Sequence, residues 1–110
     1  MRTLTSPREI DALFRSGRRG STRLLVVLVS PTSAAADPRG GVVFIAGKKL
    51  GGAVVRNRCK RVMREAVRRA GGPWPGRDVA VIARSGTQTA APHALDDSLA
   101  TALATAGVSS

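Results

Sequence analysis

The chain has 110 residues, which is the usual size of one domain and too short for two ordinary ones. Its 18 Lys and Arg outnumber its 7 Asp and Glu, giving a net charge of +11, and 43% of the residues are hydrophobic, enough for one modest core. No apolar run reaches the roughly 18 residues that cross a bilayer, and no secretory signal is visible. A single Cys and a single His exclude a disulfide framework and a Cys-rich zinc site. We therefore expect a small, soluble, cytoplasmic domain, with neither a membrane nor a disulfide partner, that binds a polyanion.

An N-terminal helix is predicted first. Ser6 and Glu9 can form a capping box, Pro7 suits the first helical position, and Gly17 can end the helix. One apolar stripe with helical spacing lies between these signals. It consists of Ile10, Leu13 and Phe14.

Two strands are expected after this helix. Residues 24–29 are a continuous branched apolar run, which is typical of a strand covered on both faces, and residues 41–46 are a second apolar run. Between them, residues 30–41 are rich in Pro, Gly and small side chains and predict a flexible loop.

A strongly basic helix is predicted from about residue 54 to residue 70. Its apolar residues fall on one stripe, its basic residues fill the remaining surface, and residues 71–73 (Gly-Gly-Pro) end it. The segment 48–69 contains nine of the 18 basic residues and only one acid, Glu65, so its net charge is +8. Because like charges repel each other, a bound anion would stabilise this face. The pattern favours a nucleic-acid surface over an ordinary solvated basic surface.

The C-terminal part predicts a third strand and a third helix. Residues 78–84 (DVAVIAR) predict a strand, residues 91–106 have helical spacing, and residues 107–110 form a tail. The order α-β-β-α-β-α, without repeats or internal linkers, predicts one α+β domain over residues 1–110, with helices packed on a small sheet.

No catalytic constellation is visible. The Gly-Lys pair at 47–48 lacks the other residues of a phosphate-binding loop. Asp96 and Asp97 are neighbours that cannot face one point on a helix, and we interpret them as charges near a helix start that complement its dipole. Cys59 lies on an apolar stripe and is interpreted as a core residue rather than a nucleophile, and His93 as a surface residue.

The spacing of basic residues in the central helix suits a phosphate backbone. Positions 57, 61, 64 and 68 lie along one helical edge, with successive side chains about one turn, or roughly 5.4 Å, apart. Arginine forks at this spacing can contact phosphates in a bidentate way. Asn57 can contact a ribose or a base edge, or it can serve as a local helix cap.

This stretch closely resembles the protein subunit of bacterial ribonuclease P, and the resemblance covers about residues 4–106. Phe14, Arg15 and Gly17 are similar to the opening of that family, and residues 78–84 are similar to its last strand. The most specific part is the basic motif. It is present as Lys48-Lys49, Gly51-Gly52, Ala53-Val54, Arg56-Asn57-Arg58, Lys60-Arg61 and Arg64-Glu65-Ala66.

The resemblance implies a fold, a reaction and partners. The fold would be an α-β sandwich, like that of some ribosomal proteins, with an unusual left-handed βαβ crossover. The reaction would be the endonucleolytic removal of the 5′ leader from precursor tRNA by a ribonucleoprotein. Its catalytic centre and Mg²⁺ would belong to a catalytic RNA subunit. This chain would bind that RNA and the leader, and would strengthen substrate and Mg²⁺ binding.

The resemblance also assigns residues. The leader would meet Lys48, Lys49 and a cleft near Ile10, Phe14 and Leu28, and no catalytic or metal-binding residue is expected in this chain. Phe14 is the only clear aromatic of that cleft, so base stacking should contribute less than phosphate contacts. The contacts with the catalytic RNA would come from Arg56, Asn57, Arg58, Lys60, Arg61, Arg64 and Arg68.

Two other functions fit the composition. A structural ribosomal protein that binds ribosomal RNA could use the same basic helix. A self-sufficient enzyme acting on phosphates would need an acid–base pair or a complete phosphate loop, and the sequence shows neither.

Trp74, in the loop after the basic helix, could stack on a base or pack within the loop.

Overall fold

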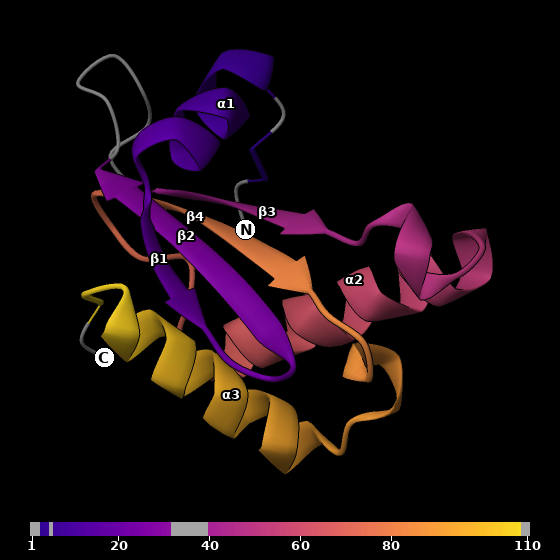
Figure 1. Ribbon diagram of the computed structural model, residues 1–110. Coiled ribbons are helices and arrows are strands. Elements are labelled where there is room, and N and C mark those ends of the chain that lie inside the picture. Colours follow the sequence, from indigo (N-terminus) through magenta and orange to yellow (C-terminus); the bar gives the residue numbers. More distant parts are fainter. Residues whose placement is uncertain (1–2, 5, 32–39, 109–110) are drawn as a thin grey trace.

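The computed structural model describes residues 3–4, 6–31 and 40–108, and within these residues three helices pack on a four-stranded sheet (Figure 1). This arrangement confirms the predicted α+β class. Two short 3-10 helices, η1 (Lys48–Leu50) and η2 (Thr87–Thr89), lie in the connections. The helices are α1 (Pro7–Ser16), α2 (Ala53–Arg69) and α3 (Pro92–Thr105), and the strands are β1 (Arg18–Ser21), β2 (Leu25–Pro31), β3 (Gly41–Ile45) and β4 (Arg77–Ala83).

One strand was not expected. β1 has the sequence RRGS and carries no apolar side chain, so hydrophobic periodicity gave no signal for it. It forms because it pairs antiparallel with β2, and Arg18 lies opposite Val29 in that pairing. The observed order is therefore α-β-β-β-α-β-α.

The predicted loop and tail differ from the structure at their ends. Residues 30 and 31 belong to β2 and residue 41 begins β3, so the connection is shorter than the predicted loop 30–41. Residues 32–39 of that loop lie outside the described residues. Val108 was expected in a tail, but its side chain is buried in the main core, whereas residues 109–110 again lie outside the described part.

The start of α1 also differs in detail. Pro7 lies at the first helical position as expected, but the side chain of Ser6 makes no capping hydrogen bond. The helix is instead fixed by burial of Leu13 and by the backbone N–H of Gly17, which donates to the carbonyl of Leu13 over 2.9 Å. The Ser6 side chain thus does not play its expected part in a capping box, and packing of the apolar stripe holds the helix.

The strand order β1-β2-β4-β3 places α2 in a crossover connection. β2 is antiparallel to both β1 and β4, whereas β3 is parallel to β4, with Val42 opposite Val79 and Ile45 opposite Ile82. Parallel neighbours need a long connection, and the segment that contains η1 and α2 provides it. The βαβ unit implied by the family resemblance is thus present.

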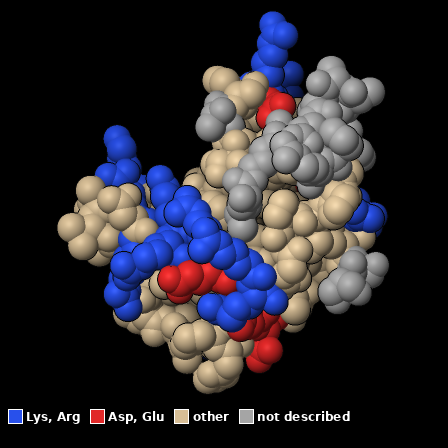
Figure 2. Space-filling model, turned by 180° about the vertical axis from the view of Figure 1, so that it is seen from behind, with Lys and Arg blue, Asp and Glu red and all other residues tan. Residues whose placement is uncertain are grey.

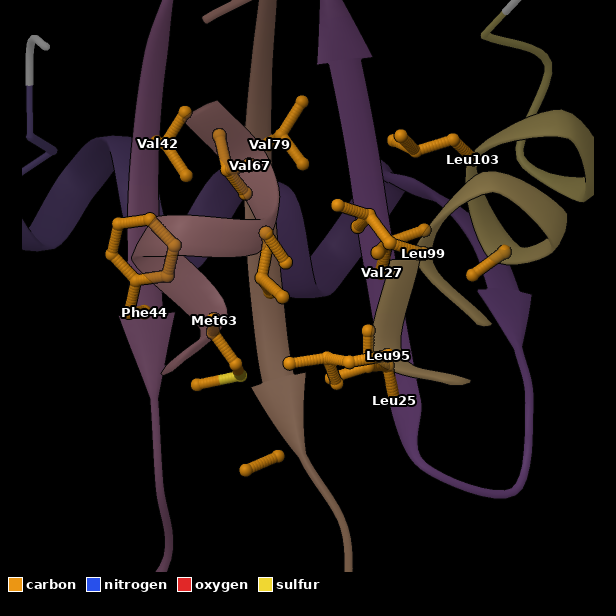
Figure 3. Packing of buried hydrophobic residues seen from close by; sticks show 14 of the residues in the cluster. Leu25, Val27, Val42, Phe44, Met63, Val67, Val79, Leu95, Leu99 and Leu103 are labelled. Atoms are coloured by element: carbon orange, nitrogen blue, oxygen red, sulfur yellow. The ribbon is translucent and has the colours of Figure 1, made fainter. Parts of the chain in front are cut away.

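The main core lies between the sheet and the pair α2 and α3 (Figures 1 and 3). Alternate residues of the central strands, such as Val27 of β2 and Val81 of β4, point into it. α2 contributes its buried side, including Met63, and α3 contributes Leu99. Because both helices bury one side here, their opposite sides face solvent.

The other face of the sheet is covered by α1 (Figure 1). Leu13 of α1 packs with Leu4, Leu28 and Ala80 in a small buried cluster. Further apolar side chains on this face are only partly buried. They are Ile10, Val43, Ile45 and Ile82.

Candidate nucleic-acid interface

The basic side chains of α2 face outward because its apolar side is fixed in the core. Cys59, Met63 and Val67 are fully buried, and Ala66 is nearly so. Figure 2 shows Lys and Arg side chains gathered in a band on the rear face, where Figure 1 places α2. Of the predicted RNA contacts on α2, Arg56 is only partly exposed and the others are exposed. These others are Asn57, Arg58, Lys60, Arg61, Arg64 and Arg68.

Arg69, at the end of α2, is held in an ion pair instead. Its Nε lies 2.9 Å and 3.0 Å from the two carboxylate oxygens of Asp96 on α3, and its Nη2 lies 2.8 Å from one of them. The hydrogen bond to Asp96 raises the pKa of Arg69. The interpretation of Asp96 and Asp97 as charges in the first turn of α3 was wrong, because that turn contains no acid and Asp96 instead joins the two helices.

Arg58 is anchored by the fold at one nitrogen. Its Nε donates a hydrogen bond of 3.0 Å to the backbone carbonyl of Gln88 in η2. The Sγ of the neighbouring Cys59 lies 3.8 Å from the Oε1 of the same glutamine. Burial raises the pKa of the Cys59 thiol, which fits a packing role rather than that of a nucleophile.

Arg64 is oriented by an aromatic ring. Its guanidinium carbon lies 5.3 Å from the centre of the Phe44 ring, which β3 holds against α2 in the core. Arg56, one turn before Lys60, differs again. Its Nε is buried and has no hydrogen-bond partner among the described residues.

Asn57 does not cap α2. The N-cap residue is Gly52, and Asn57 lies one turn inside the helix with its side chain exposed. It shares a shallow hollow of ≈ 380 Å³ with Val54, Arg58 and Arg61. Val54 is 84% exposed, and sequence analysis gave it no role beyond its place in the family motif. Val54 is an apolar side chain outside the buried stripe, and RNA-binding candidates surround it. This combination is the signal that could have identified Val54 as a candidate interface residue.

Lys48 and Lys49 form the beginning of η1, directly after β3. Both are exposed and lie between the end of β3 and the start of α2. Gly51 ends η1 with a φ of 139°, a conformation that L side chains rarely adopt, so glycine is needed for this tight passage. The passage places both lysines at the same end of the domain as the first turn of α2.

The three predicted cleft residues lie on the α1 side of the sheet, where Ile10 and Leu28 share one cluster, but they differ in exposure. Leu28 is 8% exposed beneath α1, Ile10 is partly buried beside it, and Phe14 is 54% exposed. Only Phe14 therefore offers an open aromatic face for stacking.

Two basic residues of this face were not assigned by sequence analysis. The register places Arg19 of β1 opposite Leu28. Arg84, just after β4, donates from Nη1 to the hydroxyl of Ser21 over 3.1 Å and to the carbonyl of Thr22 over 3.0 Å. Sequence analysis could not place Arg19 and Arg84 on this face, because their positions depend on the pairing of β1 in the sheet.

A separate groove of ≈ 600 Å³ lies between the end of α2 and α3. Trp74 lines it with Leu103 and Val108, and the Trp74 side chain also packs against the main core. This contact favours loop packing as the role of Trp74. His93 is exposed, as predicted.

Two features, a metal-binding cluster and a membrane-spanning helix, are absent from the described residues 3–4, 6–31 and 40–108. These residues contain no group of three His, Cys, Asp or Glu side chains that could hold a metal ion. They also contain no helix with the length and apolar character needed to span a membrane.

Comparisons with known proteins agree with this geometry. A family model described as Ribonuclease P matches residues 1–107. The ribonuclease P protein component of Brevibacillus brevis is 36% identical over 92 residues, which cover 83% of this chain and 71% of that protein. That of Herpetosiphon aurantiacus is 45% identical over 89 residues, covering 80% and 70%.

Solved structures show the same fold. The RNase P protein of Staphylococcus aureus aligns with a TM-score of 0.82 and 24% identity, over 98% of this chain and 97% of that chain. The RNase P protein of Thermotoga maritima aligns with a TM-score of 0.72 and 25% identity, over 90% and 92%. Because the family model covers nearly the whole sequence and the relatives cover most of it, the chain belongs to the family of ribonuclease P protein components.

Proposed function

We propose that this chain is the protein subunit that assists a catalytic RNA in removing the 5′ leader from precursor tRNA. The observation that carries the proposal is the outward side of α2, where cations flank the Arg56-Asn57-Arg58 motif on a helix anchored in the core. Glu65 is the only acid of that helix. A row of cations on a fixed helix binds phosphates without providing a nucleophile. Membership of the ribonuclease P family disfavours the ribosomal alternative.

In this proposal the two sides of the domain bind different RNAs. The α2 side contacts the catalytic RNA, and the α1 side receives the leader of the precursor. Lys48 and Lys49 lie exposed between the end of β3 and the start of α2, and Phe14 offers a ring for one base. The aliphatic side chains beside α1 offer no aromatic faces, so leader binding should depend mainly on phosphate contacts and decrease strongly with salt.

Chemistry is assigned to the RNA. The Mg²⁺ ions of the reaction would be bound by the catalytic RNA and the substrate, and we assign no metal ligand to this chain. The protein would strengthen Mg²⁺ binding indirectly by neutralising nearby phosphates and positioning the substrate. A cytoplasmic location, expected from the single cysteine and the RNA partners, is part of the same proposal.

The deciding experiment is cleavage of a precursor tRNA at low Mg²⁺ with RNA alone, protein alone and both together. We expect no cleavage by the protein alone, and cleavage by the mixture at a Mg²⁺ concentration that leaves the RNA alone inactive. Leader-free tRNA has no leader to remove and serves as the control substrate that no mixture should cleave. Cleavage by the protein alone, or an unchanged Mg²⁺ requirement in the mixture, would contradict the proposal.

A further inference from the structure

The cations of α2 fall into two groups, those that other elements hold and those that are free to move. Arg58 is anchored at Nε by η2, and Arg64 is stacked on Phe44 of β3. The side chains of Lys60 and Arg61, by contrast, have no hydrogen bond or ion pair with any part of the chain that the structure describes. A long free side chain adapts to many phosphate arrangements, whereas a held guanidinium presents its donors in one plane.

The anchor of Arg58 is itself rigid. Gln88 follows Thr87, which is fully buried and whose Oγ1 lies 2.8 Å from the carbonyl oxygens of Leu24 and Arg84. The backbone N–H of Arg84 also donates to this hydroxyl over 3.2 Å. These contacts fix η2 to the start of β2 and the end of β4. With its Nε engaged there, Arg58 retains both terminal nitrogens for a ligand.

The support of Arg64 is equally fixed. Phe44 is 6% exposed and belongs to the main core, so its ring cannot turn away from α2 (Figure 3). A guanidinium over such a ring gains a cation–π contact that favours one orientation of its plane. The edges of the guanidinium remain available for hydrogen bonds to an anion.

The two held arginines lie on opposite flanks of the RNA-binding side. Six residues of α-helix separate them by about 9 Å along the axis and by about 120° around it. Arg61 lies between them in both respects. Two fixed forks on opposite flanks define both the rotation and the axial position of α2 against a folded RNA, which a set of mobile charges cannot do.

Building on the proposed function, we propose that Arg58 and Arg64 are the positions at which α2 recognises the shape of its own catalytic RNA. The free cations, Lys60 and Arg61 among them, supply attraction to any RNA. Recognition then arises from a pair of phosphates in the folded RNA whose positions match the two held guanidinium groups. An ordinary duplex lacks this matched pair, so the held arginines contribute to its affinity only through their charge.

The test uses substitutions that keep every charge. Arg58→Lys and Arg64→Lys remove the planar fork, and Arg61→Lys is the matched control on the same helix. Binding of each full-length variant is measured to the catalytic RNA of the same organism and to a generic RNA duplex, at several salt concentrations. We expect Arg58→Lys and Arg64→Lys each to weaken binding to the catalytic RNA by about tenfold, with duplex binding within about twofold of wild type. Arg61→Lys replaces a free cation by another, so it should weaken binding to the two RNAs equally and by less than about threefold. All salt slopes should agree because the charge is constant.

Two results would overturn the inference. One is that Arg58→Lys and Arg64→Lys lose no more affinity for the catalytic RNA than Arg61→Lys does. The other is an equal loss on both RNAs, which would indicate a general structural effect, and thermal unfolding of each variant checks for it. Phe44→Leu is an independent variant that leaves Arg64 in place but removes its ring, and it should reproduce the loss seen with Arg64→Lys. The wild-type chain tests the proposed function separately. If it does not prefer the catalytic RNA over the duplex, the proposed function fails as well, whereas a wild-type preference that the variants keep contradicts only the inference about Arg58 and Arg64.

Discussion

α2 and α3 pack side by side on the same face of the sheet, yet their outward sides have opposite character (Figure 1). Both bury one apolar side, represented by Met63 in α2 and by Leu99 in α3. Outward, α2 presents arginines and one lysine, whereas α3 presents small and polar residues such as Ala100 and Thr101 and contains no Lys or Arg.

This difference separates what the fold needs from what function needs. Packing constrains only the inward half of each helix, so the outward half is free to be either basic or neutral at little cost to the core. The Arg69–Asp96 pair marks the boundary, because it joins the last turn of α2 to α3 and neutralises the last cation of α2. α3 is therefore expected to matter for stability and α2 for both stability and RNA binding.

The largest expected effect is on the packing of α3. A Cβ added at Gly20 of β1 would overlap the backbone carbonyl of Ala102, so Gly20→Ala should lower the free energy of unfolding by about 3 kcal/mol. Gly47→Ala is the control, because nothing lies within 4 Å of a Cβ there. Urea denaturation of both variants measures the difference. Equal stability of the two would show that α3 can move away from β1 without cost.

The next effect separates the outward sides directly. Arg61→Glu on α2 should weaken binding to the catalytic RNA on the order of tenfold to a hundredfold and reduce the salt slope by about one for each phosphate that is no longer neutralised. Thr101→Glu places a new negative charge on the exposed side of α3 and should change binding by no more than about twofold. Titrations at several salt concentrations measure both. Similar decreases in affinity from the two variants would remove the distinction between the helices.

Sequence analysis predicted the buried side of α2 well because a helix covered on one side shows a clear period in its apolar residues. The apolar stripe of this helix includes Cys59, Met63 and Val67, all of which are buried. β1 was missed for the opposite reason. Its one buried residue is Gly20, and the strand exists because of its pairing with β2 and the close approach of α3, neither of which leaves a local pattern.

The candidate interface shows the same limit. The positions of the α2 cations follow from helical spacing, but their orientation does not. The carbonyl that anchors Arg58 is 30 residues away in η2, and the ring beneath Arg64 belongs to β3. These partners meet only after the sheet has placed their elements side by side. Sequence spacing could therefore identify the basic surface but not its held and free members.

A smaller effect tests whether RNA contact extends beyond α2. Phe14 is exposed on α1, so Phe14→Ala should leave binding to the catalytic RNA unchanged but weaken binding of a leader-bearing precursor by about 1 kcal/mol, the lower end of the range for one stacked base. Holoenzyme affinities for precursor and for mature tRNA measure this discrimination. An equal decrease on mature tRNA would mean that the ring does not contact the leader.

The smallest expected effect concerns the inward side of α2. The buried thiol of Cys59 has a raised pKa, so on unfolding at alkaline pH the thiol releases its proton, whereas the folded chain retains it. The unfolded state then binds fewer protons, and the free energy of unfolding of the wild-type protein falls as pH rises above the ordinary thiol value of about 8.5. Cys59→Ser should cost about 1 kcal/mol at neutral pH, because a hydroxyl replaces the thiol in the core, but it should lack this part of the alkaline decline.

Urea denaturation under reducing conditions, at about one pH unit below and about one pH unit above the ordinary thiol value, measures the contribution of Cys59. All other titrating groups are common to the wild type and to Cys59→Ser, so the difference between their declines belongs to the thiol. An identical decline in both proteins would show that the thiol does not titrate differently on folding. Binding to the catalytic RNA at neutral pH should be the same in both, because Cys59 lies on the side of α2 that no RNA can reach.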